Sequence, residues 1–236
     1  GSLHNAIPRG GYFVLAVPDT IKENIRADWN IFSAQVNEEF IVNDPMMVWR
    51  MRSYDPEPII DDDTARRFVY ALQAVDNGVY AVCQDEALGG MTETSSNLAR
   101  VETYESTIEI QTSQRSNVMS NLDNMCNTVA AAFKLAGAKV TSSDGYPAWK
   151  MRTNSELQRI VKYTYHKLFQ KDPIIKGIHA GLECGLFAER YPNLDMVSMG
   201  PTLRDVHTPD ERLLIPTVQM VWDHLLLTLK SIPHQS

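Results

Sequence analysis

The sequence has few cysteines, little positive charge and no long apolar segment, and each shortage excludes a class of protein. Cys83, Cys126 and Cys184 are odd in number and widely spaced, so they predict neither a disulfide framework nor a zinc knuckle. We therefore expect a reducing, cytoplasmic location. No apolar run approaches the roughly 20 residues that a membrane-spanning helix needs. With 22 basic and 29 acidic residues, the net charge of -7 argues against nucleic acid and anionic membranes as partners.

Familiar metal-binding spacings are also missing. The 236 residues contain no His-x-Asp, no HExxH and no pair of histidines at helical spacing. What the chain does have is an ordinary globular composition, with 44% hydrophobic residues to build a core. It begins with Gly1 and Ser2 rather than with an initiator Met or a signal peptide. These residues resemble a cleavage scar, and we expect the natural chain to begin further upstream.

Apolar residues at a spacing of about 3.6 predict several helices. One helix begins at Thr20 and another follows Ser155. The others span Thr64–Val75, Asn117–Leu135 and Thr217–Leu229. Compact or alternating apolar runs predict strands. These strands are Gly11–Val17, Phe40–Val42, Met46–Arg52, Thr92–Val101, Tyr104–Thr112, Ala138–Thr141, Lys176–Ile178 and Asp195–Met199.

The order of these elements predicts an α+β protein with a second part of α/β character. A strand–helix–strand order appears twice within residues 11–141, which indicates β-α-β repeats in an open-faced sandwich of ferredoxin-like character. Strands and helices alternate again after Trp149, as in part of a parallel or mixed sheet. We therefore place a domain boundary near residue 150, between residues 1–150 and residues 151–236.

Four ionisable residues stand out as candidates for chemistry. His207 follows a predicted strand and could bind zinc, although a histidine beside Asp205 is more often a surface hydrogen-bonding group. His179 and Glu183 flank glycines that would let a ligand approach the backbone, or they form an exposed turn. Arg115 lies where a strand ends before a helix and could hold a carboxylate with two hydrogen bonds, or it is a surface arginine.

Several short motifs, taken together and in order, resemble the aminoacyl-histidine (Xaa-His, PepD-like) dipeptidases. The motifs are Leu3–Arg9, Glu93–Ala99, Gln114–Ser116, Tyr146–Trp149, His179–Gly185 and Gly200–Arg212. This resemblance extends from residue 3 to the end of the chain. Members of this family are co-catalytic di-zinc metallopeptidases of the bacterial cytosol that hydrolyse unblocked dipeptides, including those like carnosine.

The resemblance implies a role for each part of the chain. Residues 1–150 would be most of a lid domain for substrate binding or dimerisation. Residues 151–236 would be the C-terminal return of an α/β zinc-peptidase domain. His207 matches a metal ligand, and Asn5, Arg115, His179 and Glu183 match the surroundings of the substrate. The general base and the other metal ligands of the family lie upstream of the matched motifs, so we expect no catalytic residue within the 236 residues.

The cofactor that the resemblance implies is zinc, two ions per active site, with manganese or cobalt as alternatives. We expect residues 1–236 alone to bind metal poorly and to be inactive. The partner would be a small dipeptide, and a homodimer is left open. Two other interpretations remain. One is a non-catalytic module for peptide binding or oligomerisation, and the other is a related di-zinc aminoacylase or carboxypeptidase.

Overall fold

The computed structural model describes residues 1, 3, 6–55, 57–84, 90–143, 145, 147, 149, 152, 154–176, 183–206 and 210–233. The helices are η1 (Asp19–Ile21), α1 (Lys22–Glu39), α2 (Asp62–Ala74), α3 (Met119–Leu135), α4 (Glu156–Phe169), α5 (Glu183–Arg190) and α6 (Pro216–Ser231). The strands are β1 (Gly78–Val82), β2 (Thr92–Thr103), β3 (Ile108–Ser116), β4 (Leu203–Arg204) and β5 (Arg212–Leu213). This mixture of helices and antiparallel sheet confirms the predicted α+β class.

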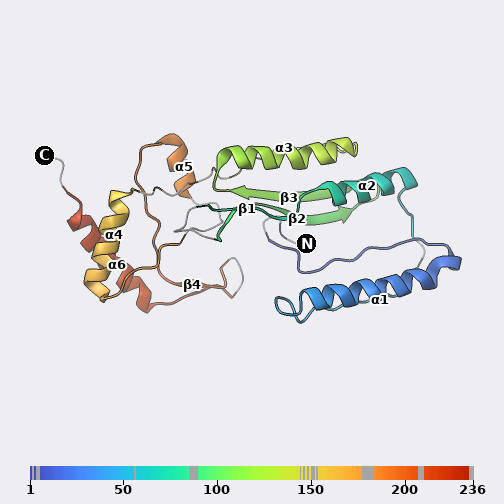
Figure 1. Ribbon diagram of the computed structural model, residues 1–236, viewed down its shortest axis with the longest axis horizontal. Helices are drawn as coiled ribbons and strands as arrows, with labels where there is room; N and C mark the ends of the chain where they lie inside the picture. Colours follow the sequence, from blue (N-terminus) through green and yellow to red (C-terminus); the bar gives the residue numbers. More distant parts are fainter. Residues whose placement is uncertain are drawn as a thin grey trace.

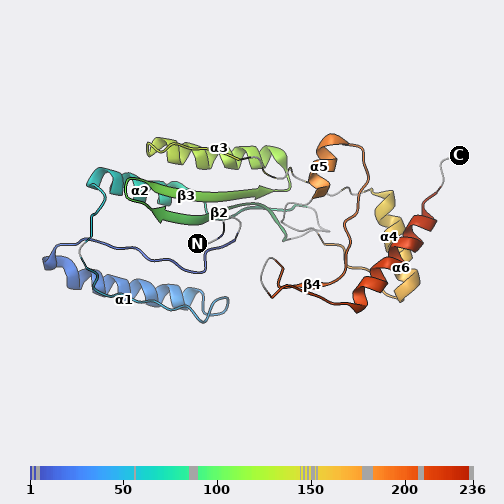
Figure 2. The ribbon, with the colours of Figure 1, turned by 180° about the vertical axis from the view of Figure 1, so that it is seen from behind.

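One antiparallel sheet organises the N-terminal part of the molecule. Its strand order is β1-β2-β3, and β2 and β3 share a long register in which Ser95 lies opposite Arg115. Helices α2 and α3 lie above this sheet, whereas α1 lies below it (Figure 1). The view from behind shows the same order of layers (Figure 2). The sheet therefore has one face toward α2 and α3 and another toward the N-terminal segment and α1.

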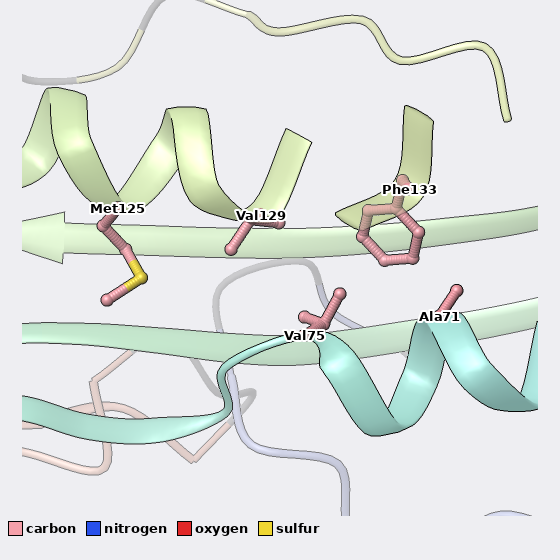
Figure 3. Packing of buried hydrophobic residues seen from close by; sticks show 5 residues of the cluster. All are labelled: Ala71, Val75, Met125, Val129 and Phe133. Carbon is pink, nitrogen blue, oxygen red and sulfur yellow. The ribbon is translucent and has the colours of Figure 1, made fainter. Parts of the chain in front are cut away.

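The hydrophobic core lies between α2 and α3, over the sheet (Figure 3). Ala71 and Val75 at the end of α2 meet Met125, Val129 and Phe133, which follow one another along α3 at helical spacing. Ile110 of β3 packs against this cluster, so its side chain marks the face of the sheet that the helices cover. No residue of α1 is buried, which leaves this core as the main apolar contact between the layers described.

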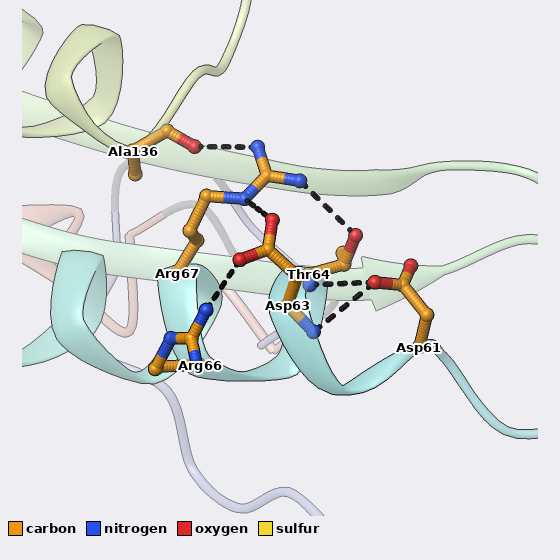
Figure 4. A network of polar contacts seen from close by, with 6 residues as sticks. All are labelled: Asp61, Asp63, Thr64, Arg66, Arg67 and Ala136. Carbon is orange, nitrogen blue, oxygen red and sulfur yellow. Dashed lines mark hydrogen bonds and ion pairs between the residues drawn. The ribbon is translucent and has the colours of Figure 1, made fainter.

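Polar groups at the start of α2 fix this helix against the end of α3 (Figure 4). The carboxylate of Asp61 accepts hydrogen bonds from the backbone N–H groups of Asp63 and Thr64, at 3.1 and 2.9 Å. The same pattern recurs at α4, where the Ser155 hydroxyl accepts from the N–H of Gln158 at 2.8 Å. Arg67 donates to the carbonyl of Ala136 at 3.1 Å. These caps satisfy backbone groups that a helix end would otherwise leave without partners.

The C-terminal part is built mainly from helices, with α4 and α6 packed together at the end of the molecule remote from α2 (Figure 1). The two short strands β4 and β5 form an antiparallel hairpin, with Leu203 opposite Leu213. No helix in the described ranges is long and apolar enough to cross a membrane.

Several predicted strands are wrong. Gly11–Val17, Phe40–Val42, Met46–Arg52, Ala138–Thr141 and Asp195–Met199 form no strand. The three-stranded sheet instead comes entirely from residues 78–116, so the strand–helix–strand order does not occur twice. An apolar run becomes a strand only when another segment pairs with it, and these runs have no strand partner among the described residues. The prediction over Lys176–Ile178 lies partly outside the described residues.

Candidate functional site

Arg115 lies at the end of β3, four residues before α3 begins at Met119, as the sequence predicts. Successive side chains of a strand alternate between the two faces of its sheet. Since Ile110 faces the helices, Arg115 lies on the opposite face, together with Ser95 across the strand pair. Its side chain is half-buried. The guanidinium is therefore carried by a rigid element rather than by a loop.

A polar network on the other face holds this end of the sheet in place. Thr94 is completely buried, and its hydroxyl lies 2.8 Å from that of Ser116. The Ser116 hydroxyl also accepts from the N–H of Val118 at 3.0 Å, where the chain turns toward α3. Asn121 of α3 donates to the carboxylate of Glu93 at 2.6 Å. Together these bonds fix the turn that follows Arg115.

The N-terminal segment crosses the same face of the sheet as Arg115. The side-chain amide of Asn97 in β2 donates to the carbonyl oxygen of Ala6 at 2.9 Å. Asn97 lies opposite Ser113, which precedes Arg115 by two residues and so shares its face. Asn5 itself lies outside the described residues. Sequence reasoning did not identify Asn97; the only signal was its position within the polar run Glu93–Ala99.

Glu183 is the first residue of α5 and is exposed. The expectation of an exposed turn at Glu183 is therefore wrong, since Glu183 and Gly185 are both helical. Gly185 is buried where α5 meets Pro147, and a Cβ atom on it would lie 2.2 Å from the Pro147 carbonyl oxygen. Only a residue without a side chain lets the helix come this close. His179, the partner expected beside Glu183, lies outside the described residues.

The loop between β4 and β5 carries His207, which lies outside the described residues. The two ends of this loop are joined by an ion pair between Arg212 and Asp205. Asp205 has a φ of 53°, in the left-handed region, which favours a sharp change of chain direction. Thr217 at the start of α6 accepts from the N–H of Thr202 at 2.9 Å and so attaches the hairpin to the helix.

One broad concavity connects these positions. Its lining includes Arg115 and Glu183, and also Leu3, Ala6, Lys176, Val206 and Asp210, which lie within three residues of Asn5, His179 or His207. Its volume is about 4250 Å³, several times the roughly 300–1,000 Å³ of a small-molecule site. The concavity is therefore a shared depression rather than a closed pocket. Arg115 and Glu183 both line this depression.

The described residues do not form a metal centre by themselves. No group of three or more His, Cys, Asp and Glu side chains suited to a metal ion occurs within the described ranges. Zinc sites of the catalytic kind use three protein ligands. The described part of the chain therefore does not fit a complete zinc site, and no catalytic step through a metal follows from its geometry.

The fold and this concavity define an α+β protein with a broad depression lined by ionisable side chains. The chain is similar over 234 residues to the cytosol non-specific dipeptidase of Escherichia coli (strain K12), with 34% identity. This match covers 99% of the chain and 48% of the relative. A crystal structure of an aminoacylhistidine dipeptidase from Vibrio alginolyticus matches with a TM-score of 0.80 and 32% identity, covering 93% of this chain and 45% of that one.

These two matches fit the C-terminal part of a PepD-like enzyme, as the sequence motifs indicate. The chain spans about half the length of the relatives it matches. The aminopeptidase PepT of Bacillus cereus matches with a TM-score of 0.52 and 16% identity over 70% of this chain and 44% of that one, which shows a shared fold alone. No protein-family model matches the chain.

Proposed function

We propose that this chain is the substrate-holding part of a metal-dependent dipeptidase that cleaves small dipeptides, including those of Xaa-His type. The observation that carries the proposal is the shared concavity, which is lined by Arg115, by Glu183 and by the neighbours of Asn5, His179 and His207. The similarity to two dipeptidases supports the same reaction.

Within this proposal each residue has a separate task. Arg115 would hold the C-terminal carboxylate of the dipeptide, because its planar guanidinium can donate two parallel hydrogen bonds. Asn5 would donate to the substrate from the segment that crosses the sheet. Glu183 and His179 would line the part of the cleft near α5. His207 would be a ligand of the metal.

The proposed metal is zinc, two ions in the complete enzyme, with manganese or cobalt as alternatives. When bound, such ions polarise the scissile carbonyl and lower the pKa of water. His207 alone cannot hold them, and the described residues supply no further ligand set. We therefore propose that the general base and the remaining ligands belong to the rest of a longer enzyme, and that residues 1–236 alone are inactive.

The proposal also assigns the two parts of the chain. Residues 1–150, with the sheet and α1 to α3, would act as a lid, and residues 151–236 would complete the catalytic domain. We propose a cytoplasmic location, in keeping with the Escherichia coli relative, a cytosol non-specific dipeptidase. The partner would be a dipeptide rather than nucleic acid or a membrane.

The test compares the full-length protein with residues 1–236. Each would be purified, supplied with Zn²⁺, Mn²⁺ or Co²⁺, and assayed on Ala-His, Gly-His and β-Ala-His. We expect turnover by the full-length protein alone. Loss of activity on the same dipeptides with an amidated C-terminus would support the role of a carboxylate-binding arginine. Turnover by residues 1–236 would overturn the claim that essential ligands lie elsewhere.

Two further substrates separate this proposal from its alternatives. N-acetylated amino acids would be cleaved by an aminoacylase, and longer peptides by a carboxypeptidase. A full-length protein that binds dipeptides but hydrolyses none of these compounds would be a binding module. The proposal requires that the full-length protein cleave free dipeptides in preference to N-acetylated amino acids and to longer peptides.

A further inference from the structure

A hydrogen bond from the side chain of Asn97 in β2 to the backbone of Ala6 attaches the N-terminal segment to the sheet. The two residues are 91 positions apart in sequence, and the amide nitrogen and carbonyl oxygen are 2.9 Å apart. The contact therefore attaches the described part of the N-terminal segment to β2.

Asn97 is itself held firmly in β2. Its neighbour Ser96 is 3% exposed, and the hydroxyl of Ser96 accepts from the side chain of Gln114 at 3.1 Å. On the other side, the N–H of Leu98 donates to the side-chain oxygen of Asn77 at 2.8 Å. The backbone at Asn97 is thus fixed from both directions. Its amide is a donor from a rigid strand to a segment that has no secondary structure of its own.

The same face of the sheet carries Arg115. Asn97 lies opposite Ser113, and Arg115 lies two residues further along β3 on the same face of the sheet. The side chains of Asn97 and Arg115 are therefore diagonal neighbours. Ala6 and Arg115 also line the same concavity. We infer that Asn97 is a positioning residue, which holds the N-terminal segment across the sheet at a fixed distance from Arg115 and so sets the width of the substrate cleft.

This inference rests on the proposed function only for its consequence in catalysis. Its structural half can be tested without any activity. The test uses Asn97→Asp, which is nearly isosteric but replaces the donor with an acceptor that faces a carbonyl oxygen. Asn97→Ala removes the donor without adding charge. Asn77→Asp is the matched control, because it adds the same charge while keeping the oxygen that accepts from Leu98.

Hydrogen exchange of residues 3–9, measured by mass spectrometry on the 236-residue chain, is the first readout. Loss of one hydrogen bond should speed exchange of this segment about fivefold in both Asn97 variants. Asn77→Asp should exchange like the wild type, and all the chains should melt at similar temperatures. Equal exchange in Asn97→Asp and Asn77→Asp would overturn the inference, whatever the protein hydrolyses.

Dipeptide kinetics of the full-length protein are the second readout. If Asn97 only positions the substrate cleft, its substitution should raise KM by about fivefold while kcat changes less than twofold. Faster exchange with an unchanged KM would overturn the role in setting the cleft. A full-length wild-type protein without dipeptidase activity would instead refute the proposed function, and the exchange result would still decide whether Asn97 positions the segment.

Discussion

The hydroxyl oxygens of Thr164 and Thr228 lie 2.9 Å apart and link α4 to α6 in the interior of the helix pair. Thr164 is completely buried, and Thr228 is nearly so. Nε2 of His224 lies 2.9 Å from the carbonyl oxygen of Val161 and 3.1 Å from the Thr164 hydroxyl. A polar contact in an apolar helix interface favours one register of the two helices over others, because another register would break the contacts that Thr228 and His224 make with α4.

We expect the two threonines to be energetically coupled. Thr164→Val and Thr228→Val keep the shape of the side chains but remove the hydroxyls. In a double-mutant cycle by urea denaturation, the coupling energy should be about 1 kcal/mol, the usual net contribution of a hydrogen bond. Additive effects of the two substitutions would contradict a direct contact. Ser33→Ala, which removes an exposed hydroxyl on α1 that donates to the carbonyl of Asn30, is a suitable control.

Gly185 should not tolerate even one additional methyl group. A Cβ atom at this position would lie 2.2 Å from a backbone oxygen that cannot move independently of its chain. We expect Gly185→Ala to reduce the free energy of unfolding by about 1–3 kcal/mol, as overpacking does elsewhere. Gly145 has no atom within 4 Å of the corresponding point, so Gly145→Ala is the matched control. Equal melting temperatures for the two variants would refute the close contact of α5 with Pro147.

All the longer helices were predictable from the sequence because apolar periodicity is local, whereas the short α5 was not predicted. The helix predicted from Thr20 is found as α1, and the helix expected after Ser155 is found as α4. The strands were less predictable, because a strand depends on partners that are distant in sequence. Gly11–Val17 has the composition of a strand but no strand partner among the described residues, whereas β1 begins at Gly78, where no strand was predicted.

For the candidate site, sequence reasoning found single residues but not the contacts that hold them in place. The location of Arg115 at a strand end before a helix is confirmed. The bond between Asn97 and Ala6 could not be predicted, since it spans 91 residues and follows from the register of β2 with β3. Glu183 was assigned to a loop because glycines surround it. In the structure, the buried Gly185 allows a helix to pack closely instead.

Asp195 should make the chain sensitive to acid. Burial opposes ionisation of its carboxyl, but hydrogen bonds from the Leu157 N–H and from Ser155, together with the charge of Arg152, hold its pKa below the usual range. A lowered pKa stabilises the fold fully above the unfolded value, which is about 3.9, and this contribution is lost as the pH falls through the folded value.

The check is urea denaturation of the wild type and of Asp195→Asn between pH 7 and pH 2. We expect Asp195→Asn to be less stable at pH 7 and to lose less stability on acidification. Asp223→Asn, which removes a carboxylate from the exposed side of α6, controls for the change of charge. Parallel pH profiles for Asp195→Asn and the wild type would exclude Asp195 as a source of the acid sensitivity.

Arg115 should contribute mainly to the capture of substrate and transition state in the full-length protein. A bidentate, charge-assisted contact to a carboxylate is worth roughly 3 kcal/mol, so Arg115→Ala should lower kcat/KM for Ala-His by about a hundredfold. Arg115→Lys keeps the charge but not the fork of donors and should recover only part of this loss. Arg100→Ala is the matched control, since Arg100 lies on β2 and is already paired with Glu102. If Arg115→Ala and Arg100→Ala have equal kcat/KM, the carboxylate of the dipeptide is bound elsewhere. An amidated dipeptide gives the complementary result, because a substrate without the carboxylate should be cleaved equally slowly by the wild type and by Arg115→Ala.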